Sequence, residues 1–231
     1  MQINKLDSPF LRYLITKQLA PGERLPTLSQ IGDELGISVG KLREQLEIAR
    51  SLGVVSVRPR VGIVREPFDF AQTILASVLF GLGSGEAQFE QFSDLRQAIE
   101  IDFWERAVAR LTAVDKQKLQ QIVANAWGKL KGNPIHVPND EHRQFHLTIF
   151  SRLENPFVQG MLAAYWDAYE ASELTRFSPY DYWLEVWEYH ERIVVAIVED
   201  DAPLGLTLLE THFDLLPTRP AMANKVSSDN R

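Results

Sequence analysis

Residues 21–64 read PGERLPTLSQIGDELGISVGKLREQLEIARSLGVVSVRPRVGIV, and this stretch decides the fold of the N-terminal part of the chain. Thr27 and Gln30 have the spacing of a capping box at the start of a helix, and Gly36 can end that helix. Ser38 then stands at the N-cap of a second helix. Two β-branched segments, VVSVR and VGIV, follow and are joined by a Pro-Arg pair, as in a β-hairpin. This order of elements predicts most of a winged helix-turn-helix.

The segments on either side complete the organisation. Upstream, Ser8 is a suitable N-cap and Pro9 a suitable first residue for a further helix. Downstream, Pro67 interrupts the segment REPFDF, and the later segments have helical periodicity without strand alternation. We therefore predict a mainly α protein with an N-terminal winged helix-turn-helix and a C-terminal all-helical bundle. The predicted limits are 1–66 for the winged domain, 67–70 for a linker, 71–216 for the helical domain and 217–231 for a disordered tail.

The composition excludes several classes of site. Cysteine is absent, which rules out disulfides, thiolate metal sites and cysteine nucleophiles. The N-terminus lacks the layout of a signal peptide, and no apolar run reaches the ~20 residues of a membrane span, so we expect a soluble cytoplasmic protein without a membrane partner. The formal net charge is −7, but residues 1–66 hold ten Lys and Arg against seven Asp and Glu, while the remainder holds fourteen against twenty-four. A basic head on an acidic body predicts that only the head meets a polyanion.

Four of the five histidines fall on apolar helical stripes. His142 and His146 are four residues apart and share one helix face, while His190 and His212 lie among apolar residues of two later helices. A neutral imidazole that faces a core must satisfy two ring nitrogens, and a metal can satisfy one while an acceptor takes the other. The pattern predicts one shared metal site, and the alternative is a set of core histidines satisfied by hydrogen bonds. The fifth, His136, lies in a predicted loop and is given no role.

Motifs in both parts of the chain resemble a known family. PGERLP, LGIS and LREQL resemble the DNA-binding head of the GntR family of transcription regulators. DLRQAIEIDFWERAVARL, HRQFHLTIFSRLENPF, YHERIVVAIVEDD and the late His212 resemble the FCD domain, the ligand-binding half of the FadR subgroup of that family. The resemblance covers roughly residues 10–216. It implies a metabolite-responsive transcription regulator, not an enzyme, that binds double-stranded operator DNA as a homodimer and represses transcription until an effector binds.

Six residues of the head are expected to contact DNA. The early turns of the helix after Ser38 can lie in the major groove, while arginines of the hairpin reach phosphates. The predicted set is Thr27, Ser38, Lys41, Arg43, Arg58 and Arg60. The family often carries arginine at the positions of Ser29 and Val39, so fewer bidentate guanine contacts are available here and Lys41 with Arg43 carries more of the binding. The alternatives are a solvated amphipathic helix and a winged helix used for protein contact.

The resemblance also implies a ligand set. Many FCD domains bind a divalent metal through one aspartate and three histidines. His146, His190 and His212 match the three histidines, and His142 stands in place of the aspartate. Four neutral nitrogen donors remain. Imidazole-rich sites favour Zn²⁺, Ni²⁺ or Cu²⁺ over harder ions, so zinc is the first expectation and nickel the second.

Arg96 is the expected effector-binding residue. It shares a helix face with Phe92, Ile99 and Phe103, which directs the guanidinium into the bundle, where it needs an anion. The functional interpretation is a small organic acid that contacts both Arg96 and the metal. The structural alternative is an ion pair with Glu100, four residues on. Two further functions stay open: a metal-free regulator that responds to an acyl thioester, and a hydrolase that uses a histidine-bound metal.

Overall fold

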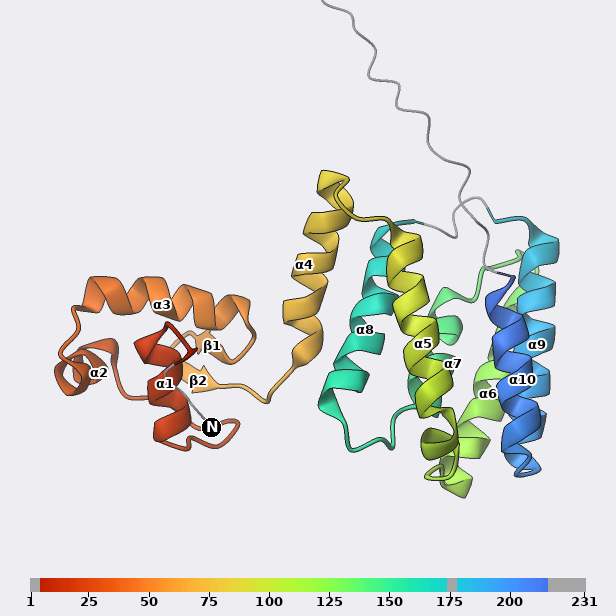
Figure 1. The fold of residues 1–231 in the computed structure, drawn as a ribbon, viewed down its shortest axis with the longest axis horizontal. Coiled ribbons are helices and arrows are strands. Elements are labelled where there is room, and N and C mark those ends of the chain that lie inside the picture. Colours follow the sequence, from red (N-terminus) through yellow and green to blue (C-terminus); the bar gives the residue numbers. More distant parts are fainter. Residues whose placement is uncertain (1–4, 174–177, 216–231) are drawn as a thin grey trace, which may run out of the picture. The chain divides into compact units, whose positions relative to one another are not determined.

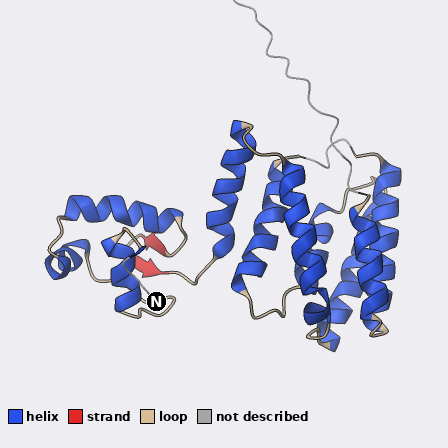
Figure 2. Ribbon diagram, in the orientation of Figure 1, coloured by secondary structure: helices blue, strands red, loops and turns tan. Residues whose placement is uncertain are grey.

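The structure is a computed structural model that describes residues 5–173 and 178–215. Its described part contains ten helices and one two-stranded sheet (Figure 2), which confirms the expected fold class. None of the described helices combines the length and apolar character needed to cross a membrane. The expected disordered tail at 217–231 lies outside the described residues.

The chain divides into two compact units that do not follow chain order. One unit comprises the described residues up to Ala87 together with Glu154–Ala168. The other comprises Gln88–Leu153 and the described residues from Tyr169 onward. The chain therefore returns to the first unit before it completes the second.

The first unit begins with three helices and a hairpin (Figure 1). Their bounds are α1 Pro9–Thr16, α2 Leu28–Leu35, α3 Val39–Ser51, β1 Val55–Arg58 and β2 Gly62–Arg65. The expected caps are present: the side chains of Ser8, Thr27 and Ser38 each accept a hydrogen bond from the backbone N–H three residues on. Gly36 ends α2 in the left-handed conformation, at φ 65°. Each N-cap of this kind contributes about 1 kcal/mol, so these helix boundaries are determined locally.

A hydrophobic core holds these helices and the hairpin together. It is formed by Phe10, Tyr13, Leu14, Leu25, Ile31, Leu42, Leu46, Ala49, Val55 and Ile63. Burying a large side chain of this kind contributes about 1.5–3 kcal/mol. Gln45 of α3 adds a directional contact, since its Oε1 accepts hydrogen bonds from the Phe10 backbone N–H (2.9 Å) and the Ser8 hydroxyl (3.1 Å). The core thus holds α3 by its inner face and leaves its outer face exposed.

The two strands form an antiparallel hairpin. Val55 lies opposite Arg65 at the open end, and Arg58 lies opposite Gly62 next to the turn. Arg24, from the segment before α2, forms an isolated bridge to β2. The PGERLP segment is therefore anchored to the hairpin.

The segment after the hairpin differs slightly from the expected linker. Residues 66–69 have no regular structure, and α4 (Phe70–Ser84) starts at the last residue assigned to the linker at 67–70. The helix starts there because the Asp69 carboxylate accepts a hydrogen bond from the Ala71 backbone N–H (2.8 Å) and so acts as N-cap.

The second unit is a helical bundle. Its helices are α5 Phe89–Val108, α6 Ala113–Leu130, α7 Asn139–Ile149, α9 Tyr180–Val198 and α10 Ala202–Phe213. Helix α8 Pro156–Ala171 belongs to the first unit up to Ala168. Within the second unit α5 packs against α10, α10 against α9, α9 against α6, and α6 against α7 (Figure 1). Buried aromatic residues from α5, α7 and α9 fill the interior, and they include Trp104, Phe145, Trp183 and Trp187. Side chains from α5, α7, α9 and α10 can therefore meet in one core.

Helix α10 lies unusually close to α5. A Cβ atom at Gly205 would stand 2.7 Å from Cζ2 of Trp104. This is shorter than real Cβ contacts, so only glycine fits here without a shift of the neighbouring side chain. The indole Nε1 of Trp104 also donates a hydrogen bond to the Ala202 carbonyl at the start of α10 (2.8 Å). These two contacts set the spacing between α5 and α10.

Candidate metal centre and DNA-binding residues

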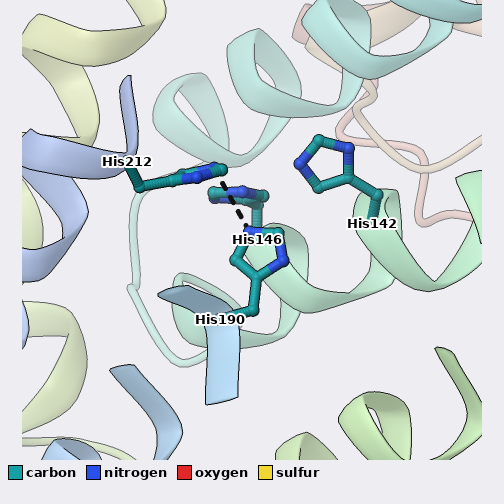
Figure 3. Close-up of side chains that lie close together, drawn as sticks. All are labelled: His142, His146, His190 and His212. Atoms are coloured by element: carbon teal, nitrogen blue, oxygen red, sulfur yellow. Dashed lines mark hydrogen bonds between the residues drawn. The ribbon is translucent and has the colours of Figure 1, made fainter. Parts of the chain in front are cut away.

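Four histidines from three helices meet inside the second unit. His142 and His146 come from α7, His190 from α9 and His212 from α10, and their rings gather around a common point (Figure 3). Each is at most 1% exposed. With one ring nitrogen taken from each, the four nitrogens all lie within 4.8 Å of one another. The structure brings together the four histidines singled out in the sequence, and it leaves His136 exposed before α7.

The donor set fits a divalent metal. In a tetrahedral site with Zn–N bonds of about 2.0–2.1 Å, neighbouring nitrogens are about 3.3 Å apart. His190 Nε2 and His212 Nε2 are 3.2 Å apart, which is close to that separation (dashed line in Figure 3). The Nδ1 atoms of the same two rings are buried and have no hydrogen-bond partner among the described residues. Among the described residues, these two rings are therefore paired only through their Nε2 atoms, and a metal bound between those atoms would replace that contact.

The surroundings of the cluster keep its imidazoles neutral. The ring centroid of His190 lies 4.2 Å from that of Phe145 and 4.7 Å from that of Trp187. Burial holds the pKa of all four histidines well below the ordinary value of about 6.5, and the charge of Arg96 lowers the pKa of each further. Neutral imidazole is the form that binds a metal, so the site is prepared for one at neutral pH.

A buried ion pair lies beside the histidines. Arg96 and Glu100 of α5 make a two-point contact, with Nε 2.8 Å from Oε1 and Nη2 3.2 Å from Oε2. Glu100 Oε2 is also 3.0 Å from Nδ1 of His146, and Arg96 Nη2 is 2.9 and 3.1 Å from the two ring nitrogens of that histidine. Burial raises the pKa of Glu100, while the Arg96 charge lowers it. Because a guanidinium does not lose its proton and a lone buried charge is costly, both partners are charged at neutral pH.

The buried face of α5 is rotated relative to the one expected from the sequence. Arg96 points inward as expected, at 1% exposure. However, Ile99 and Phe103 are only partly buried, and the buried face runs through Glu100 and Trp104 instead. The face is decided by α10, which packs on the Trp104 side of α5. The partner that the structure gives Arg96 is therefore the one considered as the structural alternative.

The six residues expected to contact DNA lie at the surface of the first unit. All are exposed, and they are Thr27, Ser38, Lys41, Arg43, Arg58 and Arg60. The hydroxyls of Thr27 and Ser38 cap α2 and α3, so the N-terminus of each helix is at the surface. Lys41 and Arg43 belong to the first turns of α3, on the side away from the core. Such a helix end offers both a positive dipole and side-chain cations to a phosphate or a base edge.

The hairpin contributes arginines in different states. Arg58 Nη2 is paired with Glu66 Oε1 at 2.7 Å, so Glu66 partly neutralises this arginine, and only the remaining N–H groups can contact a phosphate while the pair is formed. Arg60 lies in the hairpin turn at φ 63° and has no ion pair among the described residues. Arg24, which was given no role from the sequence, is exposed, and its Nε is 3.4 Å from the position of a Cβ on Gly62. The arginine of the PGERLP motif therefore lies next to the hairpin turn, and its place in that motif is the sequence signal that could have identified it.

Comparison with known proteins accounts for both parts of the chain. The family of bacterial regulatory proteins called gntR matches residues 11–64, and the FCD domain matches residues 91–215. The chain is 26% identical over 194 residues to the uncharacterized HTH-type transcriptional regulator YcbG of Bacillus subtilis (strain 168), and the match covers 81% of this chain and 76% of that protein. A solved structure of a GntR protein from Streptococcus agalactiae is similar with a TM-score of 0.66 at 15% identity, covering 92% of this chain and 97% of that one.

These matches agree with the architecture. The FCD match alone spans more than half of the 231 residues and contains the four histidines, Arg96 and Glu100. The gntR match contains most of α1, the capped helices α2 and α3, and the hairpin up to Val64. The solved structure shares the fold. The chain belongs to the GntR family of bacterial transcription regulators and consists of a DNA-binding winged helix-turn-helix followed by a C-terminal FCD domain.

Proposed function

We propose that this regulator binds operator DNA as a homodimer, and that its FCD domain holds a divalent metal together with a small carboxylate effector that lowers operator affinity. The observation that carries the proposal is the set of four buried histidine nitrogens within 4.8 Å of one another. Repression relieved by the effector is the direction proposed, because it follows when the effector favours an arrangement of helices that fits the operator less well.

The proposed metal ligands are His142, His146, His190 and His212. Their neutral nitrogens and the absence of a carboxylate among them favour zinc, with nickel second. With four imidazoles bound, the metal would accept a carboxylate oxygen of the effector by expanding its coordination from four to five ligands. His142 replaces the aspartate that many FCD domains use, so the chain itself contributes one negative charge fewer to this site.

Arg96 is the proposed second contact for the effector. Its guanidinium is buried and lies against His146, so it borders the metal ligands. Glu100 takes two of the five N–H groups of the guanidinium, and a carboxylate effector shares the same cation with Glu100. If Arg96 serves only the ion pair, the effector response does not depend on it beyond the loss of stability.

In the proposed dimer, two winged heads face the two halves of a pseudo-palindromic operator. Helix α3 enters the major groove with Lys41 and Arg43, and Arg60 contacts the backbone phosphates from the hairpin turn. Effector binding favours one arrangement of the FCD helices, which alters the separation of the heads and so the operator affinity. The proposal needs no change within the winged domain.

The first test is native mass spectrometry of tag-free protein prepared without chelator. The expected spectrum contains a dimer with one metal per chain and the mass of a co-purified acid. His190→Ala should lose the metal, whereas His136→Ala, which removes the exposed histidine, should keep it. A wild-type dimer that carries no metal and does not bind added zinc would show that the four histidines are core residues only, and would remove the metal from the proposal.

The second test connects the site to DNA. An operator is selected from random duplexes by the protein itself, and its affinity is measured by fluorescence anisotropy while small organic acids are added. Arg96→Ala should abolish the response to an acid that releases the wild-type protein, and Arg152→Ala, which breaks an ion pair elsewhere in the bundle, should retain it. An unchanged response in Arg96→Ala would leave Arg96 with a structural role only.

The same preparations separate the alternative functions. A metal-free regulator of acyl thioesters would show a bound acyl compound and no metal in the native spectrum. A hydrolase would cleave esters or amides in the metal-loaded state, and for this chemistry it needs a carboxylate base beside the metal. Glu100, the carboxylate 3.0 Å from His146, is instead held by Arg96.

A further inference from the structure

Glu100 is the most deeply buried acid beside the histidine cluster. Its side chain is 0% exposed, and it reaches two partners at once: the guanidinium of Arg96 through both carboxylate oxygens, and Nδ1 of His146 through Oε2 at 3.0 Å. The acid comes from α5 and the histidine from α7, so this contact joins two helices that are far apart in sequence.

The contact with Glu100 determines which nitrogen of His146 carries the proton. An ionised carboxylate only accepts hydrogen bonds, so Nδ1 must be the N–H donor when it faces Glu100. The lone pair of the ring then lies on Nε2. The geometry of Arg96 supports this choice, because both oxygens of Glu100 already accept N–H groups of the guanidinium, so Oε2 faces Nδ1 as an acceptor.

We propose that Glu100 is a positioning residue, which holds His146 in the Nδ1–H form and turns its Nε2 toward the proposed metal. The inference rests on the proposed metal site. A carboxylate that accepts the second N–H of a ligating histidine orients the ring and makes its donor nitrogen more basic. In this chain such an acid is more important for the charge of the site, because the ligand set has His142 in place of an aspartate and so contains no carboxylate.

The structure also defines the competing arrangement. Arg96 Nη2 lies 2.9 Å from Nδ1 of His146 and 3.1 Å from Nε2. If the guanidinium donated to Nδ1, the ring proton would sit on Nε2 and His146 would face the metal with the wrong nitrogen. The two arrangements place the proton on different atoms, so the tautomer of His146 decides between them.

The first experiment reads that tautomer directly. Full-length protein labelled with ¹⁵N at histidine is stripped with chelator, and long-range ¹H–¹⁵N correlation spectra are recorded near neutral pH, with the His146 signals assigned from the spectrum of His146→Gln. We expect the Nδ1–H form at His146. The Nε2–H form would overturn the inference, whether or not the protein binds a metal.

The second experiment measures zinc affinity by competition with a chromophoric chelator. Glu100→Gln should weaken binding about 10–100-fold. Asp115→Asn is the matched control, because Asp115 of α6 makes the same kind of two-point contact with Arg152, at 2.9 and 3.0 Å. Unchanged affinity in Glu100→Gln, or an equal loss in Asp115→Asn, would refute the positioning role. Wild-type protein that binds no zinc would instead refute the proposed metal site, and the tautomer would still decide the role of Glu100.

Discussion

The metal-free protein should lose stability as the pH falls below about 6.5, where ordinary carboxylates do not yet titrate, because of its four buried histidines. Their pKa values in the folded chain lie well below about 6.5, whereas the unfolded chain titrates near 6.5. At pH values between these two, the histidines are protonated in the unfolded chain and neutral in the folded chain. Stability is therefore fully present above pH 6.5 and is lost as the pH falls toward the lowered pKa values of the folded state.

The magnitude follows from the number of protons. One pH unit below 6.5, each histidine that stays neutral in the folded state costs about 1.4 kcal/mol of unfolding free energy. Four such groups cost about 5.6 kcal/mol, which is comparable with the whole stability of a domain. Glu100 acts with the opposite sign, since its raised pKa lets the folded chain take up a proton that the unfolded chain lacks above about pH 4.5, and it offsets at most about one of the four.

The assay is urea denaturation of chelator-treated protein, followed by tryptophan fluorescence between pH 7.5 and 5.0. This window lies above the range in which ordinary carboxylates titrate. The expected dependence corresponds to three to four protons, and His212→Gln should remove one of them. His136→Gln should leave the dependence unchanged, since that histidine is exposed. A dependence of one proton or fewer would show that the folded cluster accepts protons, and the argument from burial would be wrong.

Three further predictions concern charge. Arg96→Met leaves Glu100 buried without its partner and should lower the free energy of unfolding by about 3–5 kcal/mol, whereas Arg152→Met, at a pair whose arginine is 49% exposed, should cost about 1 kcal/mol or less; chemical denaturation compares the two. His142→Asp should raise the affinity for Mn²⁺ relative to Zn²⁺ about tenfold in competition titrations, and an unchanged ratio would place residue 142 outside the ligand set. Lys41→Ala should weaken operator binding and reduce the slope of log affinity against log salt by about 1, while Lys118→Ala, on an exposed part of α6, should change neither in anisotropy titrations.

Local rules were sufficient for the winged domain. The caps at Ser8, Thr27 and Ser38 are hydrogen bonds made within three residues, so the sequence alone determines where these helices begin. The left-handed end of α2 at Gly36 is equally local. For the same reason, the helical spacing of His142 and His146 could be interpreted without a tertiary structure.

The remaining features depend on contacts between distant segments. The partner of Arg96 is settled by the packing of α10 on α5, which turns Glu100 inward in place of Ile99. The pairing of Arg58 with Glu66 depends on the register of the hairpin. The periodicity of a sequence carries no information on the distance between two helices. The convergence of α7, α9 and α10 on one point could therefore be inferred only from a family resemblance or from a structure.

The close approach at Gly205 has a consequence for how such sites are recognised in other sequences. The methyl group of an alanine at this position would meet Trp104 at 2.7 Å and push α10 away from α5, and it would carry His212 with it. A relative could then keep every histidine and still fail to assemble the cluster. An inventory of ligands is therefore an incomplete signature for this domain, and the small residue seven positions before the last histidine belongs in it as much as the histidines do.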